Sequence, residues 1–190
     1  METTLLTTDT NRKEKDQFRT ISLTALLTGT LYLIAANIQF YFNTQRGAAL
    51  KFTGAEEPVS FISYLSQGGP CYFFKYIAGA VFGPEAYAGG TLMIVWGVVF
   101  HYIIAFLFTL CFFVAYTKTR KLLHSQVMVV VAYGLLIWTV MTLVVVPLSK
   151  IGELPGDWET AVTGWLTLTA AVALPVALIA GRFYADHRKH

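Results

Sequence analysis

Four stretches of the chain, residues 20–45, 86–117, 122–149 and 160–181, contain no lysine, arginine, aspartate or glutamate. A transmembrane helix needs about 20 mostly apolar residues, and each stretch is longer than that. The composition agrees, since 55% of the 190 residues are hydrophobic and only 13% are charged. The sequence therefore predicts an all-α integral membrane protein with four transmembrane helices, and the segments between them are too short for a soluble catalytic domain.

The ends of these stretches divide the chain into spans, loops and tails. The predicted transmembrane helices cover residues 20–43, 89–116, 126–149 and 161–182. The remaining segments are a tail at 1–19, a loop at 44–88, connectors at 117–125 and 150–160, and a tail at 183–190. Because two of the connections are short, successive helices should be antiparallel neighbours in an up-down four-helix bundle. Residues 1–16 are polar, and we expect them to form a mobile tail.

The basic residues are distributed unequally between the two sides of this threading. Ten of the 14 lysines and arginines fall in the two tails, in the 117–125 connector or at the last residue of the fourth span, and four fall in the other two loops. Basic residues near the ends of spans favour the cytoplasmic side, so both termini are predicted to be cytoplasmic and the loops at 44–88 and 150–160 external. The net charge of +3 is then explained by this topology, and the basic residues are also expected to attract anionic lipid head groups. We expect membrane lipids as partners, and no nucleic acid.

The second half of the first loop is too apolar for an ordinary solvated segment. Apolar residues recur there at helical spacing, Pro70 suits a helix start, and Gly83-Pro84 suits a helix end. We predict a short helix near residues 70–83. Lys75 and the Gly68-Gly69 pair argue against a fifth span, so an external interfacial helix is preferred to a re-entrant segment packed under the bundle.

His101, near the middle of the second span, is the only histidine deep within a predicted transmembrane helix. An ionisable side chain at that depth is by default a hypothesis for a functional site. However, Gly97, His101, Ala105 and Thr109 recur every four residues, a pattern that also describes a helix-packing seam held by an interhelical hydrogen bond. The structural interpretation is preferred because no second histidine and no carboxylate lies within the spans, but both remain open.

Four further polar side chains could face His101 across the bundle. They are Asn37 and Gln39 in the first span and Thr139 and Thr142 in the third. Together with His101 they would form a polar intramembrane site, lining a passage for a small solute or a proton. Alternatively, they pair with one another and hold helices together, which is the commoner role when no charged group lies at depth.

Prolines and small residues shape the last two spans. Pro147 and Pro175 each remove a backbone hydrogen bond, and we expect kinks there without a gating role. Ala173, Ala177 and Gly181 form a stripe of small residues that lets another helix approach closely. That helix could belong to the same chain or to a second copy, so the stripe also predicts a homo-oligomer.

Sequence signatures of catalysis and metal binding are missing. There is no phosphate-binding glycine loop, no nucleophile elbow and no cluster of ligands with metal spacing. The threading places Cys71 and Cys111 on opposite sides of the membrane, so they should not pair, and we expect one of them to be buried among apolar neighbours. The external acidic residues are interpreted as a solvated rim. We therefore expect no enzyme activity, no metal and no cofactor.

Several motifs in the middle of the chain resemble those of a bacterial membrane-protein family. Residues 74–83 read FKYIAGAVFG, residues 86–90 read AYAGG, and residues 100–106 read FHYIIAF; Tyr133-Gly134 and residues 141–149 continue the pattern. In these motifs the chain resembles the uncharacterised YagU-like four-span proteins. The resemblance implies an inner-membrane protein without an established activity, in which the apolar loop helix belongs to the architecture and His101 occupies a marked position.

The sequence thus predicts a non-enzymatic, multi-pass protein of the bacterial plasma membrane whose molecular role is undetermined. The alternative is a transporter or channel component in which His101 and Asn37 line a polar passage. A lipid-modifying enzyme with His101 as base is disfavoured, because the sequence offers no identifiable nucleophile or acid partner.

Overall fold

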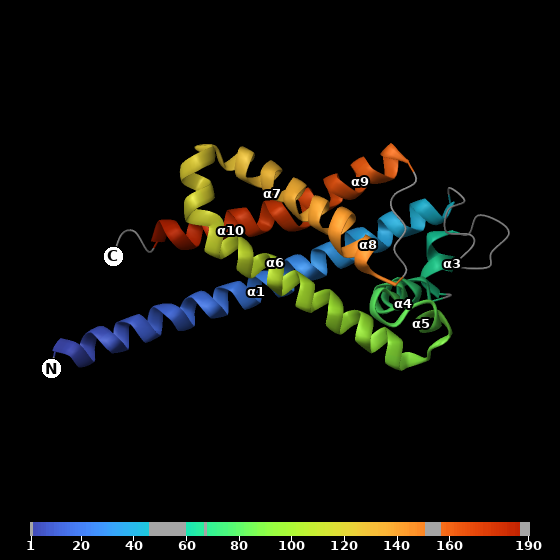
Figure 1. Ribbon diagram of the computed structural model, residues 1–190, viewed down its shortest axis with the longest axis horizontal. Coiled ribbons are helices and arrows are strands. Elements are labelled where there is room, and N and C mark those ends of the chain that lie inside the picture. Colours follow the sequence, from blue (N-terminus) through green and yellow to red (C-terminus); the bar gives the residue numbers. More distant parts are fainter. Residues whose placement is uncertain (1, 46–59, 67, 151–156, 187–190) are drawn as a thin grey trace.

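The computed structural model describes residues 2–45, 60–66, 68–150 and 157–186, and these residues form helices joined by short turns (Figure 1). The segments outside this description include residues 46–59 and 67 of the predicted 44–88 loop, part of the 150–160 connector and the end of the C-terminal tail. Within the described residues, four helices are long and apolar enough to cross a membrane: Glu14–Phe42, Thr91–Leu123, Gln126–Leu148 and Trp158–Ala185. The predicted all-α membrane fold with four spans is confirmed.

The first two spans are continuous α-helices, α1 (Glu2–Gln45) and α6 (Thr91–Leu123). The prediction of a mobile tail at residues 1–16 is wrong from residue 2 onward, because α1 extends through it and runs past the other spans toward the N-terminus (Figure 1). The physical reason is cooperativity: a helix already nucleated in the span adds one hydrogen bond for each further residue.

The third and fourth spans each contain a π-helical segment just before a proline. The third span consists of α7 (Gln126–Val140), η1 (Met141–Val145) and α8 (Val146–Leu148), and the fourth of α9 (Trp158–Leu168), η2 (Thr169–Ala173) and α10 (Leu174–Asp186). Pro147 and Pro175 follow η1 and η2 by two residues. A wider turn accommodates the proline ring and its missing N–H, so the helices continue through both prolines.

The four spans share a core in the half of the bundle that contains the chain termini, which we call the tail end. Phe113, Val129, Ile137 and Val176 are among its fully buried side chains. By contrast, large apolar side chains point outward along every span, as expected where lipid rather than water covers a helix.

The described residues of the other half of the bundle, which we call the loop end, include three short helices: α3 (Phe61–Ser66), α4 (Gly69–Phe82) and α5 (Glu85–Ala88). The helix predicted near residues 70–83 is α4, one residue away at each end. Figure 1 shows α4 almost end-on, so it runs across the direction of the spans. The Nζ atom of Lys75 donates to the Tyr87 carbonyl at 3.1 Å, which ties α4 to α5.

The helix α4 packs tightly on the bundle. Ala78 and Gly79 are buried, and the backbone of Phe74 lies directly against Gly97 of α6. On the other side, the Lys150 backbone N–H, just beyond α8, donates to the Ala80 carbonyl at 3.0 Å. The helix therefore joins the loop ends of the second and third spans, and is more closely attached than a helix lying only on the membrane surface.

Candidate functional site

His101 lies where α6 crosses α1, and its side chain is 7% exposed. Its Nε2 atom is 2.8 Å from the carbonyl oxygen of Gly29 in α1. A carbonyl can only accept a hydrogen bond, so this contact requires the proton on Nε2. The imidazole thus acts as a donor that joins two spans, as the packing interpretation of the sequence predicts.

Aromatic rings from both helices enclose this imidazole. The Tyr32 ring of α1 stacks on it with 6.0 Å between centroids and an interplanar angle of 7°, while the Tyr102 ring of α6 meets it edge-on at 5.2 Å. The Tyr102 hydroxyl is 2.9 Å from the Thr30 hydroxyl, which adds a second hydrogen bond between the helices. These partners were not predicted from the sequence, although each lies one turn or less from Gly29 or His101.

The close approach of the two spans depends on Gly29. A Cβ atom there would lie 3.1 Å from the Tyr102 ring and 3.2 Å from the Ala105 Cβ, both tighter than ordinary contacts. The predicted stripe on α6 is therefore a packing seam: Gly97 faces α4, and His101 and Ala105 face α1. Thr109, at the end of the stripe, is fully buried and donates to the Ala105 carbonyl of its own helix at 2.8 Å.

Asn37 lies eight residues beyond Gly29, which corresponds to about 12 Å along an α-helix. Its Nδ2 donates to the Leu33 carbonyl at 2.9 Å, and its Oδ1 accepts from the Tyr64 hydroxyl of α3 at 3.3 Å. Burial raises the pKa of the Tyr64 phenol to about 12, so this donor keeps its proton at neutral pH. Asn37 thus binds a loop-end helix and does not contact His101.

The other predicted site residues are also separated from His101. Gln39 donates from Nε2 to the Thr163 hydroxyl of α9 at 3.3 Å, and so joins the first and fourth spans. Among the described residues, neither Thr139 nor Thr142 hydrogen-bonds with His101, Asn37 or Gln39; both are half-buried in the third span. The structure therefore distributes the predicted polar set over separate helix contacts.

A further polar cluster lies at the tail end, where the sequence analysis did not place one. The Nε2 of Gln126 donates to the Ala177 carbonyl at 2.8 Å, and its Oε1 accepts from the Tyr116 hydroxyl at 3.1 Å. The Tyr116 ring stacks on Tyr184, whose hydroxyl donates to the Phe113 carbonyl at 2.7 Å. Gln126 thus joins the second, third and fourth spans. Its position at the first residue of the predicted third span was the available signal.

This cluster also shows where the small-residue stripe of the fourth span packs. Ala173 and Ala177 are fully buried within the chain, and a Cβ on Gly181 would lie 3.0 Å from the Tyr116 hydroxyl. Of the two uses considered for the stripe, the structure therefore places it inside the bundle. The two alanines have no surface left for a second copy.

Two shallow, overlapping grooves lie on the membrane-facing side of the seam between α1 and α6. They measure about 260 and 500 Å³, share Leu26, Tyr102 and Phe106, and contain neither His101 nor Asn37. Their two polar groups already have partners, since Ser22 donates to the Phe18 carbonyl and Tyr102 bonds Thr30. These grooves are apolar surface features and do not form a passage through the bundle.

The described part of the chain holds no group of three or more His, Cys, Asp or Glu side chains that could bind a metal ion. Cys71 and Cys111 are unpaired, as predicted, but both are exposed, so the expectation that one is buried is wrong. Cys111 is exposed because it faces outward from the apolar surface of α6. Comparison with protein-family models, curated proteins and solved structures finds no match to this chain.

Proposed function

We propose that this chain is a non-enzymatic integral membrane protein in which the polar residues of the spans hold helices together. The observation that carries the proposal is the hydrogen bond from His101 Nε2 to the Gly29 carbonyl. It fixes the proton on Nε2 and ties the buried imidazole to a second span, and neither groove on the seam between α1 and α6 is lined by His101. The separate contacts of Asn37 and Gln39 support the same role, because each side chain bonds a different helix.

The proposal extends to location and family. The excess of lysine and arginine in the tails and the 117–125 connector supports a plasma membrane protein with cytoplasmic termini. The motifs at residues 74–83, 86–90 and 100–106 support a place among the YagU-like bacterial inner-membrane proteins. The competing proposal, a carrier with His101 and Asn37 lining a polar passage, would require these two residues to share a water-filled space.

Replacing His101 with alanine is expected to lower the free energy of unfolding by about 2 kcal/mol, because an interhelical hydrogen bond is lost and a buried side chain leaves a space. His101→Gln, whose amide nitrogen can reach the Gly29 carbonyl, should restore much of this loss. Unfolding in detergent micelles measures both variants. In proteoliposomes, proton and solute flux should be equal for wild type and His101→Ala. A variant that keeps its stability but loses flux would establish the carrier.

Cys71 provides a test of the threading. It is exposed on α4, so a membrane-impermeant maleimide should label it from outside in intact spheroplasts. Cys111 faces the apolar surface of α6 and should remain unlabelled, because a charged reagent does not enter the bilayer core. Cys71→Ser is the control and should abolish the signal. Labelling that occurs only after lysis would reverse the proposed orientation.

A further inference from the structure

The short helix α3 exposes three large apolar side chains although it lies outside the spans. Ile62 is 79%, Leu65 46% and Phe61 38% exposed, and the helix contains no charged residue. Side chains of this kind gain free energy by leaving water, so such a surface on a segment outside the spans requires a partner.

Contacts with α1 place α3 at a defined depth. The Tyr64 hydroxyl reaches Asn37, and the Phe61 ring lies 5.1 Å from the Tyr41 ring. Asn37 lies six residues before residue 43, the predicted end of the first span. At 1.5 Å per residue this corresponds to about 9 Å. The helix therefore lies beside the last turns of the span, at the depth of about 5 to 10 Å to which interfacial helices bury their apolar faces.

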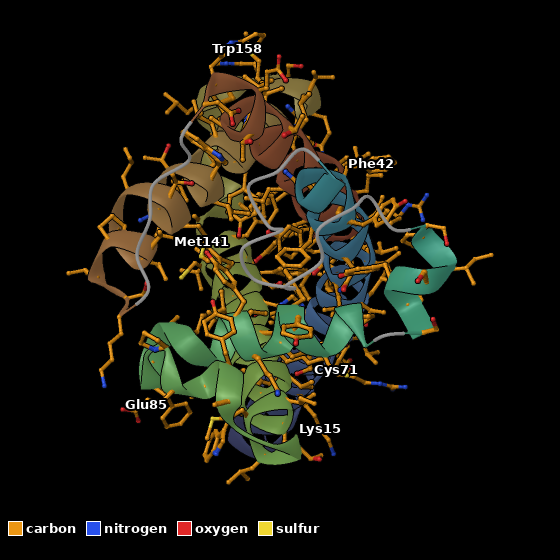
Figure 2. The ribbon with its side chains drawn as sticks, turned by 90° about the vertical axis from the view of Figure 1, so that its right-hand side faces the viewer. Lys15, Phe42, Cys71, Glu85, Met141 and Trp158 are labelled. Atoms are coloured by element: carbon orange, nitrogen blue, oxygen red, sulfur yellow. The ribbon has the colours of Figure 1, made fainter. Side chains whose placement is uncertain are left out.

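The helix cannot turn its exposed side chains inward. Tyr64 is buried among the rings of α1, and Gly69 of α4 packs directly against the Tyr64 ring. A Cβ at Gly69 would collide with that ring. Figure 2 shows α3 standing out to the side of the bundle, next to the end of α1 marked by Phe42.

Besides its contacts with α3, α1 carries an exposed apolar strip on its membrane-facing surface. Ile34, Ile38 and Phe42 lie one turn apart on that helix and are all exposed. In a membrane, lipid would cover this strip. At the depth of α3 the lipid is the boundary between head groups and acyl chains, so this boundary is the partner available to the exposed side chains of α3. In contrast, α4 directs its buried face at α6.

We propose that α3 is an in-plane membrane anchor, and that Phe61, Ile62 and Leu65 insert into the lipid leaflet around the loop end of α1. The partner is the bilayer surface itself. This inference concerns lipid contact outside the spans, and it does not rest on the role proposed for His101.

Spin-label accessibility tests the anchor without a destabilising substitution. In a background with Cys71→Ser and Cys111→Ser, a nitroxide is attached at Ile62→Cys and the protein is placed in vesicles of phosphatidylethanolamine and phosphatidylglycerol. Glu85→Cys, on exposed α5, provides the aqueous reference, and Ile103→Cys, on the exposed face of α6, provides the bilayer reference. The ratio of accessibility to oxygen over accessibility to a nickel chelate should be several-fold higher at Ile62 than at Glu85, and should approach that at Ile103.

Two results would overturn the proposal. A ratio at Ile62 equal to that at Glu85 would place α3 in water. Dipolar broadening between labels at Ile62 that disappears on dilution with unlabelled protein would show that a second copy covers the helix. The same measurement at Leu65→Cys should give the same ranking, and a water-like ratio there would equally contradict the anchor.

Discussion

Gly97→Ala is expected to force α4 away from α6 and to lower the free energy of unfolding by about 3 kcal/mol, the upper end of the usual cost of overpacking. The added Cβ would lie 2.7 Å from the carbonyl carbon and 2.9 Å from the Cα of Phe74, and closer still to the carbonyl oxygen. These are backbone atoms in the middle of a 14-residue helix, so no rotamer change relieves the clash. Denaturant titration in micelles measures the loss.

Gly164→Ala is the matched control for this substitution. Gly164 also lies within a spanning helix, but its added Cβ would meet the nearest neighbour, Nε1 of Trp138, at 3.5 Å, an ordinary contact distance. Its effect should stay within about 0.5 kcal/mol, as for most substitutions that disturb no buried contact. Equal losses at Gly97 and Gly164 would show that α4 does not depend on the close contact.

Gly134→Ala should lower the free energy of unfolding by about 2 kcal/mol, because it overpacks the contact between the third and fourth spans. The added Cβ would collide with the Thr169 hydroxyl, and would lie 2.9 Å from the Cβ and 3.1 Å from the Cα of that residue. Thr169 is the first residue of η2, and its hydroxyl donates to the Trp165 carbonyl at 2.8 Å. The clash therefore meets a side chain that is already held in place. Thermal unfolding in micelles measures the change.

A double variant separates this clash from the intrinsic effect of alanine in the helix. Thr169→Ala removes the hydroxyl nearest to the new methyl group, so Gly134→Ala should cost less stability in that background than in wild type. The coupling in the double-mutant cycle should be about 1 kcal/mol in the stabilising direction, as expected for residues in contact. Strict additivity would mean that the two helices do not meet at these residues.

The positions of the spans could be predicted because they depend on local composition. A run of about 20 apolar residues without charge is helical in a membrane whatever surrounds it, since its backbone polar groups must pair within the segment. The limits of α4 also depend on local signals, Pro70 near its start and Gly83-Pro84 after its end. The predicted limits therefore differ from the structure by only one residue at each end. Residues 2–16 were mispredicted because their polar composition conceals continuity with the span.

The candidate site could be predicted only in part. His101 was identified by its depth, and the four-residue stripe around it indicated a seam. Its partner was not predictable, because a backbone carbonyl such as that of Gly29 has no sequence signature. Asn37 and Gln39 lie two residues apart in the first span but face α3 and α9, respectively. About 100° of rotation per residue along an α-helix sends such neighbours to different partners.

The sequence by itself determined that this chain crosses a membrane four times and that each span contains a long stretch without lysine, arginine, aspartate or glutamate. Both properties follow from the solvent, since lipid selects apolar segments and excludes charge. Only the tertiary structure decided that the small residues of the fourth span face inward, that α4 packs on the backbone of α6, and that His101 donates to Gly29. These contacts depend on where two helices cross. Glycines such as Gly29 and Gly97 have no side chain, so the helices can approach closely enough to form these contacts.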